Sequence, residues 1–266
     1  MQVFIDGDAT LDVRVDGTSG DPVVLIHGFP LSREIWNAQA EALARTHRVV
    51  LPNLRGAGAS SAGAGPYLME SLAADVAAAL DALAIERATI VGHSLGGYVA
   101  LAFARMFSER VDRLALVCSR LAADSADQAA ARGELADRIE REGSIAAAID
   151  AYLPRLLAPE TFAMHPQIEQ RVRAIAMEYK PEGAAALLRG MALRDPASDI
   201  VADLQMPMAM IAGAHDVVLS VAEARDVAHA FPAGRLVVCE HSGHLPMLEE
   251  PQRVSEALQA LLERPG

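Results

Sequence analysis

The chain has 266 residues, of which 52% are hydrophobic, and it carries 35 acidic and 23 basic side chains for a formal net charge of −12. A chain of this length and composition can bury one large α/β core together with an appended segment. Its negative charge repels phosphate backbones and anionic lipid surfaces, so neither nucleic acid nor a membrane is expected as a partner.

The chain starts with two predicted strands, at residues 3–5 and 11–15, joined by a turn at Gly7 and Asp8. The second run alternates apolar and polar residues, which favours an antiparallel pair with one solvated face. Later strands are continuous apolar runs, typical of parallel strands covered on both faces. These six runs are residues 23–26, 49–51, 89–91, 114–117, 209–211 and 236–238.

Helical stretches alternate with these strands, at residues 32–45, 71–83, 95–107, 221–230 and 251–263. This alternation predicts right-handed crossovers and a mostly parallel, eight-stranded sheet flanked by helices.

The segment at residues 120–207 lacks a convincing strand and is too long for a plain loop. Its predicted helices lie at residues 127–141, 145–156, 166–179 and 181–194, with Pro166 and Pro181 suited to first turns. We therefore expect a helical lid at 120–207, inserted between strands 6 and 7, while residues 1–119 and 208–266 form the core.

A serine stands where a buried strand is predicted to turn into a helix, in Gly92-His93-Ser94-Leu95-Gly96. Such a turn raises the hydroxyl above the sheet, and the flanking glycines bring no Cβ into collision with neighbouring backbone. This placement favours Ser94 as a nucleophile, although a helix cap at a tight turn is the structural alternative.

A serine hydroxyl needs a base to take its proton and a carboxylate to orient that base. Asp216 and His244 each follow a predicted strand, and parallel strands bring their carboxyl ends to one edge of the sheet. The sequence thus predicts that Ser94, Asp216 and His244 converge as catalytic residues. His241 is the nearest alternative to His244.

Two backbone N–H groups are needed to bind the oxygen of a tetrahedral intermediate. Leu95 follows the serine at a helix N-terminus, and Phe29 follows the first parallel strand. Pro30 cannot donate, so Phe29 and Leu95 are the predicted oxyanion-hole residues.

The motifs His27-Gly28-Phe29-Pro30, Gly92–Gly97, Gly213-Ala214-His215-Asp216 and Ser242-Gly243-His244 together resemble the α/β-hydrolase superfamily. Within it the chain is similar to lidded carboxylesterases and enol-lactonases. The resemblance implies a cofactor-free serine esterase. Some relatives place the catalytic acid where Asp124 lies. Relatives also typically carry Asp at the position of Asn53, so a structural ion pair is expected to be missing there.

The predicted function is hydrolysis of a small to medium carboxylic ester or lactone through an acyl-enzyme. With the same triad, the alternatives are a C–C bond hydrolase or a cofactor-free perhydrolase or haloperoxidase, and a non-catalytic ligand-binding receptor is a further alternative. No His, Cys and acidic residues stand at metal-ligand spacing, so no metal and no cofactor are expected. The expected partner is the small-molecule substrate, with the chain a monomer or homodimer.

Apolar side chains of the lid and of the first helix could contact the substrate, although such residues more often pack the core. The predicted substrate contacts are Trp36, Tyr152, Leu156, Met164 and Met177. The first residues lack a basic stretch typical of a secretory signal, which favours a cytoplasmic location. Cys118 and Cys239, the two cysteines, are expected to stay reduced.

Overall fold

The computed structural model describes residues 1–5 and 9–264, and in this part of the chain eight strands form one sheet in the order β1-β2-β4-β3-β5-β6-β7-β8. The strands are β1 Gln2–Phe4, β2 Thr10–Asp16, β3 Pro22–Ile26, β4 Arg48–Pro52, β5 Ala88–His93, β6 Val111–Val117, β7 Met208–Gly213 and β8 Gly234–Cys239. The predicted turn at Gly7 and Asp8 lies outside the described residues.

The sheet is antiparallel at one edge and parallel elsewhere. β1 pairs with β2 and β2 with β4 in antiparallel register, while every pairing from β4 through β8 is parallel. The fold is the predicted α/β-hydrolase fold. β4 and β5 lie on opposite sides of β3, so the chain passes across β3 between them. Because these strands are parallel, their carboxyl ends meet at one edge, where loops can bring distant residues together.

Continuous apolar sequence places the central strands between two helical layers. All six residues of β5 and of β7 are buried. β8 differs from the prediction that all six parallel strands are covered on both faces. It is the edge strand, and Leu236, Val237 and Val238 are only half-buried because a neighbour covers one side alone.

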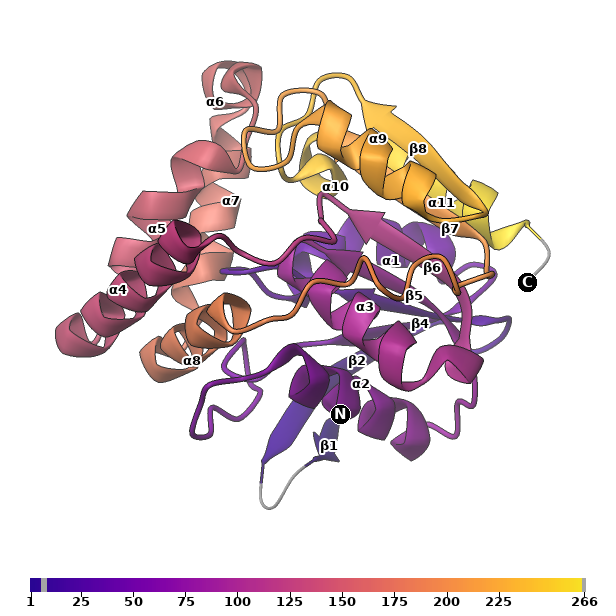
Figure 1. The fold of residues 1–266 in the computed structure, drawn as a ribbon, viewed down its shortest axis with the longest axis horizontal. Helices are drawn as coiled ribbons and strands as arrows, with labels where there is room; N and C mark the ends of the chain where they lie inside the picture. The colour runs from indigo at the N-terminus through magenta and orange to yellow at the C-terminus, as the bar shows by residue number, and fades with distance from the viewer. Residues whose placement is uncertain (6–8, 265–266) are drawn as a thin grey trace.

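Helices of the core pack on the two faces of the sheet (Figure 1). α2 lies beside α3 on one face, and α1 lies beside α11 on the other. The core helices are α1 Asn37–Leu43, α2 Met69–Ala82, α3 Leu95–Met106, α9 Val221–Ala230, α10 Pro246–Glu249 and α11 Pro251–Leu262, with 3-10 turns at Arg33–Trp36 and Ser108–Arg110.

Residues 120–207, called the insertion below, contain the remaining helices. These are α4 Ala126–Glu142, α5 Ala146–Tyr152, α6 Pro159–Met164, α7 Pro166–Met177 and α8 Pro181–Ala192, with a 3-10 turn at Leu153–Arg155. Pro166 and Pro181 occupy first turns as predicted, and a capping box of Ser125 and Gln128 begins α4. The short helix α6 was not predicted. Figure 1 shows α4 to α8 grouped at one end of the molecule, beside the sheet rather than on its faces.

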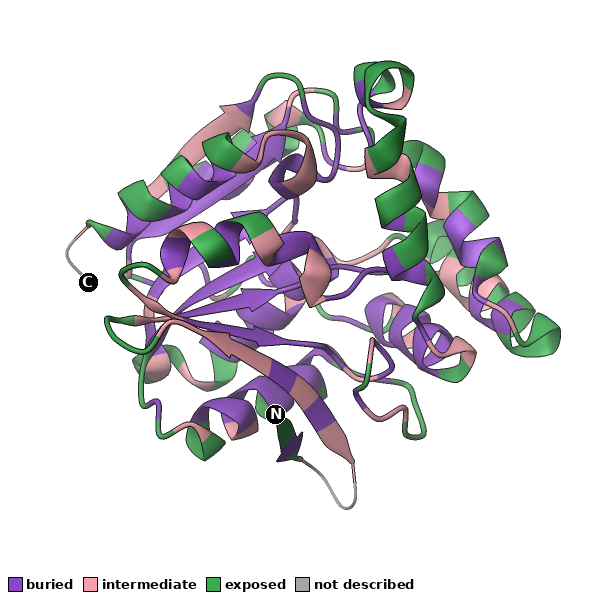
Figure 2. Ribbon diagram, turned by 180° about the vertical axis from the view of Figure 1, so that it is seen from behind, coloured by how far each residue is buried: buried purple, intermediate pink, exposed green. Residues whose placement is uncertain are grey.

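Burial follows this arrangement. The strands are buried in the middle of the core, whereas the insertion buries its helices mainly along the sides that face one another and the core (Figure 2). Among residues 1–5 and 9–264, no helix is both long enough and apolar enough to cross a membrane.

Candidate active site

Ser94 lies in the turn between β5 and α3 with a left-handed backbone, φ 50° and ψ −113°. Such a conformation is costly for a residue with a Cβ, so it persists only where the surroundings enforce it. An added Cβ on Gly92 would lie 2.1 Å from the carbonyl oxygen of Gly96, and one on Gly96 would lie 2.4 Å from that of Ile26. The turn is therefore packed against the neighbouring backbone, and Ser94 stays half-exposed above it.

Hydrogen bonds fix both backbone groups of Ser94. Its N–H donates to the carbonyl of Val117 at 2.9 Å, which ties the turn to the end of β6. Its carbonyl oxygen accepts from the N–H of Gly97 and from the hydroxyl of Ser119, each at 2.9 Å. The Ser119 contact was not predicted, because no sequence pattern links residues in the loops after two different strands. These bonds leave the side chain of Ser94 to point toward the loop after β8.

Ser94, His244 and Asp216 form one hydrogen-bonded chain. The distance from Ser94 Oγ to His244 Nε2 is 2.9 Å, and that from His244 Nδ1 to Asp216 Oδ2 is 2.7 Å. With Asp216 as a carboxylate, Nδ1 carries the proton and Nε2 accepts from the serine hydroxyl. The structure thus brings together the three residues that the sequence singled out.

Asp216 is held as an anion by its surroundings. Burial acts to raise the pKa of its carboxyl, but His244 and two backbone donors outweigh burial and hold this pKa below its usual range. The donors are the N–H groups of Val218 and Leu219, which lie 2.7 and 3.0 Å from Oδ1. One carboxylate oxygen is thus fixed by backbone, and the other is left for the imidazole.

Two further histidines support the loops without joining this chain. His93 Nε2 donates to the carbonyl of His244 at 2.9 Å, and an added Cβ on Gly28 would lie 2.4 Å from His93 Nδ1. His27 Nε2 accepts from the N–H of Leu54 at 2.9 Å. Burial lowers the pKa of His93 to about 3 and that of His27 to about 4, so both rings are neutral at pH 7.

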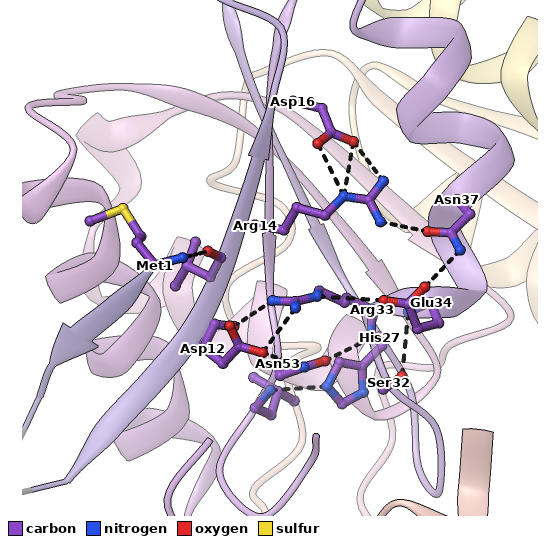
Figure 3. A network of polar contacts seen from close by, with 12 residues as sticks. Met1, Asp12, Arg14, Asp16, His27, Ser32, Arg33, Glu34, Asn37 and Asn53 are labelled. Atoms are coloured by element: carbon purple, nitrogen blue, oxygen red, sulfur yellow. Dashed lines mark hydrogen bonds and ion pairs between the residues drawn. The ribbon is translucent and has the colours of Figure 1, made fainter. Parts of the chain in front are cut away.

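Figure 3 shows a polar network of Asp12, Arg33 and Asn53 close to His27, which lies two residues before Phe29 in the chain. Asn53 accepts from the N–H of Arg33 at 2.9 Å and donates to Asp12 at 3.3 Å, while the guanidinium of Arg33 pairs with Asp12 at 2.9 Å. An ion pair is therefore present although position 53 is an amide. Asp12 on β2 supplies the carboxylate, and Asn53 bridges the two partners.

The N–H groups of Phe29 and Leu95 both remain available. Neither donates to another residue in the described ranges, and Leu95 is the first residue of α3, where an N–H has no partner within the helix. Edge-on contacts hold the ring of Phe29, with centroids 5.5 Å from Tyr152 and 5.9 Å from Tyr179. Both tyrosines come from the insertion, so this segment packs directly on the loop that carries Phe29.

Two cavities lie near these residues, one at Tyr152 and one at Asp216, and neither is lined by Ser94, Phe29 or Leu95. One of about 430 Å³ is lined by Tyr98 and Val218 of the core, by Tyr152, and by arginines including Arg132 and Arg155. The other, of about 590 Å³, is lined by residues that include Leu157, Phe162 and Asp216.

Of the five predicted substrate contacts, two lie at a cavity or at the loop of His244, and three line neither cavity. Tyr152 lines the first cavity, and Leu156 is buried beside the loop of His244, to whose N–H its carbonyl is bonded at 2.9 Å. Trp36 lines neither cavity, because it is completely buried in the core. Met164 and Met177 also line neither cavity, because 67% and 55% of their surfaces are exposed on α6 and α7.

Asp124, the alternative acid, has other partners. Its carboxylate pairs with Arg132 and with Arg194 at 2.8 Å, and the guanidinium of Arg194 lies over the ring of Tyr98 at 3.8 Å. These arginines hold the pKa of Asp124 below its usual range against the opposing effect of burial. Asp124 thus joins two parts of the insertion, and Arg194 carries the contact to Tyr98 of the core. His241, the alternative base, is exposed.

One group of metal-ligating residue types occurs in the described part of the chain: Cys118, Asp216 and His244, with ligand-type atoms within 4.8 Å of one another. Burial raises the pKa of the Cys118 thiol well above its usual value, so the thiol keeps its proton and hydrogen-bonds with Asp216. A protonated thiol is a poor metal ligand, and the carboxylate of Asp216 already accepts from Val218, Leu219 and His244.

A serine at the turn after a parallel strand, hydrogen-bonded to a histidine that is itself hydrogen-bonded to a buried aspartate, is the arrangement typical of the α/β-hydrolase class. The family model described as "alpha/beta hydrolase fold" matches residues 21–251, and the chain belongs to this family.

Individual relatives cover nearly the whole chain. An esterase from Thermogutta terrifontis, solved with malate bound, is 35% identical with a TM-score of 0.95, covering 98% of this chain and 97% of its own. The enol-lactonase from Burkholderia xenovorans LB400 is 27% identical with a TM-score of 0.89, covering 96% and 97%. The 3-oxoadipate enol-lactonase 2 of Acinetobacter baylyi is 27% identical, covering 97% of this chain and 94% of the relative.

Proposed function

We propose that this protein is a serine hydrolase that cleaves a small to medium carboxylic ester or lactone through an acyl-enzyme. The observation that carries this proposal is the hydrogen-bonded chain from Ser94 Oγ through His244 to Asp216, with contacts of 2.9 and 2.7 Å. The esterase and enol-lactonases among its relatives support the same reaction class.

In the first half of the reaction, His244 Nε2 takes the proton of Ser94 as the oxygen attacks the ester carbonyl. The N–H groups of Phe29 and Leu95 bind the developing oxyanion, and each such donor is worth roughly 10²–10³ in rate. Asp216 stabilises the imidazolium, which then protonates the leaving alcohol. In the second half, water takes the place of the alcohol and frees the acid.

The insertion serves as a lid in this proposal. Its Tyr152 packs edge-on against Phe29, whose N–H is proposed to bind the oxyanion, so Tyr152 would contact the bound substrate. Leu156 is the second proposed contact, since it meets the loop of His244. Ser94 is only partly buried, which favours an enzyme over a receptor because a nucleophile must reach its substrate.

The direct test is turnover on a panel of short p-nitrophenyl esters and simple lactones, with Ser94→Ala as the matched control. Turnover by the wild type and a loss of several orders of magnitude in the variant are expected. Equal rates for the two proteins would overturn the proposal. Diketone substrates and peroxide-dependent assays in the same panel separate carbon–carbon hydrolysis and peracid formation from ester hydrolysis.

A further inference from the structure

Glu249, the last residue of α10, turns its side chain back toward the loop that carries His244. Its Oε1 accepts from the N–H of Gly243 at 2.9 Å. Its Oε2 accepts from the N–H of Ala158 at 2.8 Å and from the hydroxyl of Thr161 at 2.6 Å. One carboxylate thus binds the residue before His244 with one oxygen and the insertion with the other.

The two segments that Glu249 joins also touch each other directly. The N–H of His244 donates to the carbonyl of Leu156 at 2.9 Å. An added Cβ on Gly243 would lie 2.7 Å from the nitrogen of Ala158, so no side chain fits between the two backbones. A shift of this part of the insertion must therefore be passed to the backbone of His244.

Glu250, the next residue, makes a similar set of contacts to the same loop but none to the insertion among the described residues. Its Oε2 accepts from the N–H of His241 at 2.9 Å and from the hydroxyl of Ser242 at 2.6 Å. Neighbouring glutamates thus hold successive parts of one loop, and only Glu249 extends to the insertion. This difference makes Glu250 a built-in control.

We propose that Glu249 is a positioning residue that couples the insertion to His244, so that the placement of residues 158–161 sets the alignment of the imidazole with Ser94. The coupling rests on the proposed function only where it refers to catalysis. The three contacts and the close approach at Gly243 hold independently of it.

A carboxylate is needed because donors approach it from both sides. An amide in its place has one accepting atom and one donating group, so Glu249→Gln turns an NH₂ either toward the Gly243 N–H or toward the donors of the insertion. Burial raises the pKa of Glu249 above its usual range, and the hydrogen bonds from Thr161, Ala158 and Gly243 oppose this shift.

The test compares three variants with the wild type. Glu249→Gln breaks the bridge, Thr161→Val removes one contact on the insertion side only, and Glu250→Gln removes an anchor of the loop without touching the insertion. Two readouts are taken: kcat and KM on a p-nitrophenyl ester, normalised to titrated active sites, and hydrogen exchange of the amides of Ala158 and Gly243.

Coupling predicts that Glu249→Gln lowers kcat by roughly 10–100-fold, the scale of a misplaced catalytic group, and speeds exchange at both amides. Thr161→Val should lower kcat several-fold and speed exchange at Gly243, although residue 161 lies in the insertion and bonds to Glu249 rather than to Gly243. Glu250→Gln should leave exchange at Ala158 unchanged. Should Glu249→Gln fail to fold, Thr161→Val decides alone.

The proposal is overturned if Thr161→Val leaves both kcat and exchange at Gly243 at wild-type values, since Glu249 would then brace the two segments separately. Exchange needs no substrate. A wild type that hydrolyses no ester would therefore contradict the proposed function, while the exchange data would still test the coupling.

Discussion

Asp216 and His244 are joined by a 2.7 Å contact between Oδ2 and Nδ1, and the other oxygen of Asp216 is occupied by two backbone N–H groups. The carboxylate can therefore neither rotate away from the imidazole nor find another partner at low cost. This arrangement fixes the tautomer of His244 that has Nε2 free to accept the proton of Ser94.

The first prediction concerns this contact. Asp216→Asn keeps the shape but replaces the anion, so the amide favours the wrong tautomer of His244 and no longer stabilises the imidazolium. We expect kcat to fall roughly 10⁴-fold with little change in KM. Steady-state kinetics on a p-nitrophenyl ester checks this. A loss of less than tenfold would mean that another group orients the base.

The second prediction tests whether Asp124, rather than Asp216, is the catalytic acid. Asp124→Asn leaves the buried guanidinium of Arg194, whose side chain is 4% exposed, without its counter-charge. Breaking a buried pair in this way costs about 3–5 kcal/mol of unfolding free energy. Urea denaturation measures this loss. Asp124→Asn should retain far more kcat per folded molecule than Asp216→Asn, and the reverse order would make Asp124 the catalytic acid.

The third prediction tests the tight turn at Ser94. Gly92→Ala places a methyl group 2.1 Å from the carbonyl oxygen of Gly96, a backbone atom that cannot yield without moving the serine. We expect a loss of about 3 kcal/mol or more in unfolding free energy and a marked fall in kcat.

Gly133→Ala is the matched control for this substitution. Gly133 lies within α4 with no heavy atom within 4 Å of the added Cβ, so alanine should raise stability by up to about 1 kcal/mol. Thermal unfolding of the two variants should thus move in opposite directions. A Gly92→Ala protein as stable as the wild type would contradict the packing of the turn.

The fourth prediction concerns pH. Burial lowers the pKa of His27 to about 4 and that of His93 to about 3, so below about pH 6.5 the unfolded chain binds protons that the folded chain does not. The unfolding free energy should therefore fall as the pH falls from about 6.5 to 4, by at most about 1.4 kcal/mol per pH unit for each histidine.

Urea denaturation between pH 4.5 and 6.5 measures this slope. His27→Gln should reduce the slope by the contribution of about one proton, whereas His229→Gln, exposed on α9, should leave it unchanged. A slope unaffected by His27→Gln would mean that this ring is protonated in the folded protein.

Sequence patterns predicted most of the strands and helices and the residues that directly follow them, because these depend on nearby residues in the chain. Ser94, Asp216 and His244 each follow a parallel strand, and the topology of such a sheet is enough to bring its strand ends together. The apolar run of β8 could not reveal that β8 is the edge strand, because the burial of a strand depends on what packs against it in the fold.

The sequence did not predict the contacts between segments that are far apart in the chain. Glu249 and Glu250 look like solvent-exposed acidic residues at a helix end, and only the fold reveals that Gly243, Ala158 and Thr161 aim donors at one of them. Trp36 and Met177 were both predicted to contact the substrate, but Trp36 lies in the core and Met177 on the surface. Apolar character alone does not distinguish positions in the core, on the surface and in a cavity.

The most direct test of the central claim is labelling with a fluorophosphonate followed by mass spectrometry of the digested protein. A single phosphonate on the peptide of Ser94 is predicted for the wild type, with much slower labelling of His244→Ala and none at this peptide in Ser94→Ala. An unlabelled wild-type serine, or labelling that is as fast without His244, would contradict an activated nucleophile at position 94.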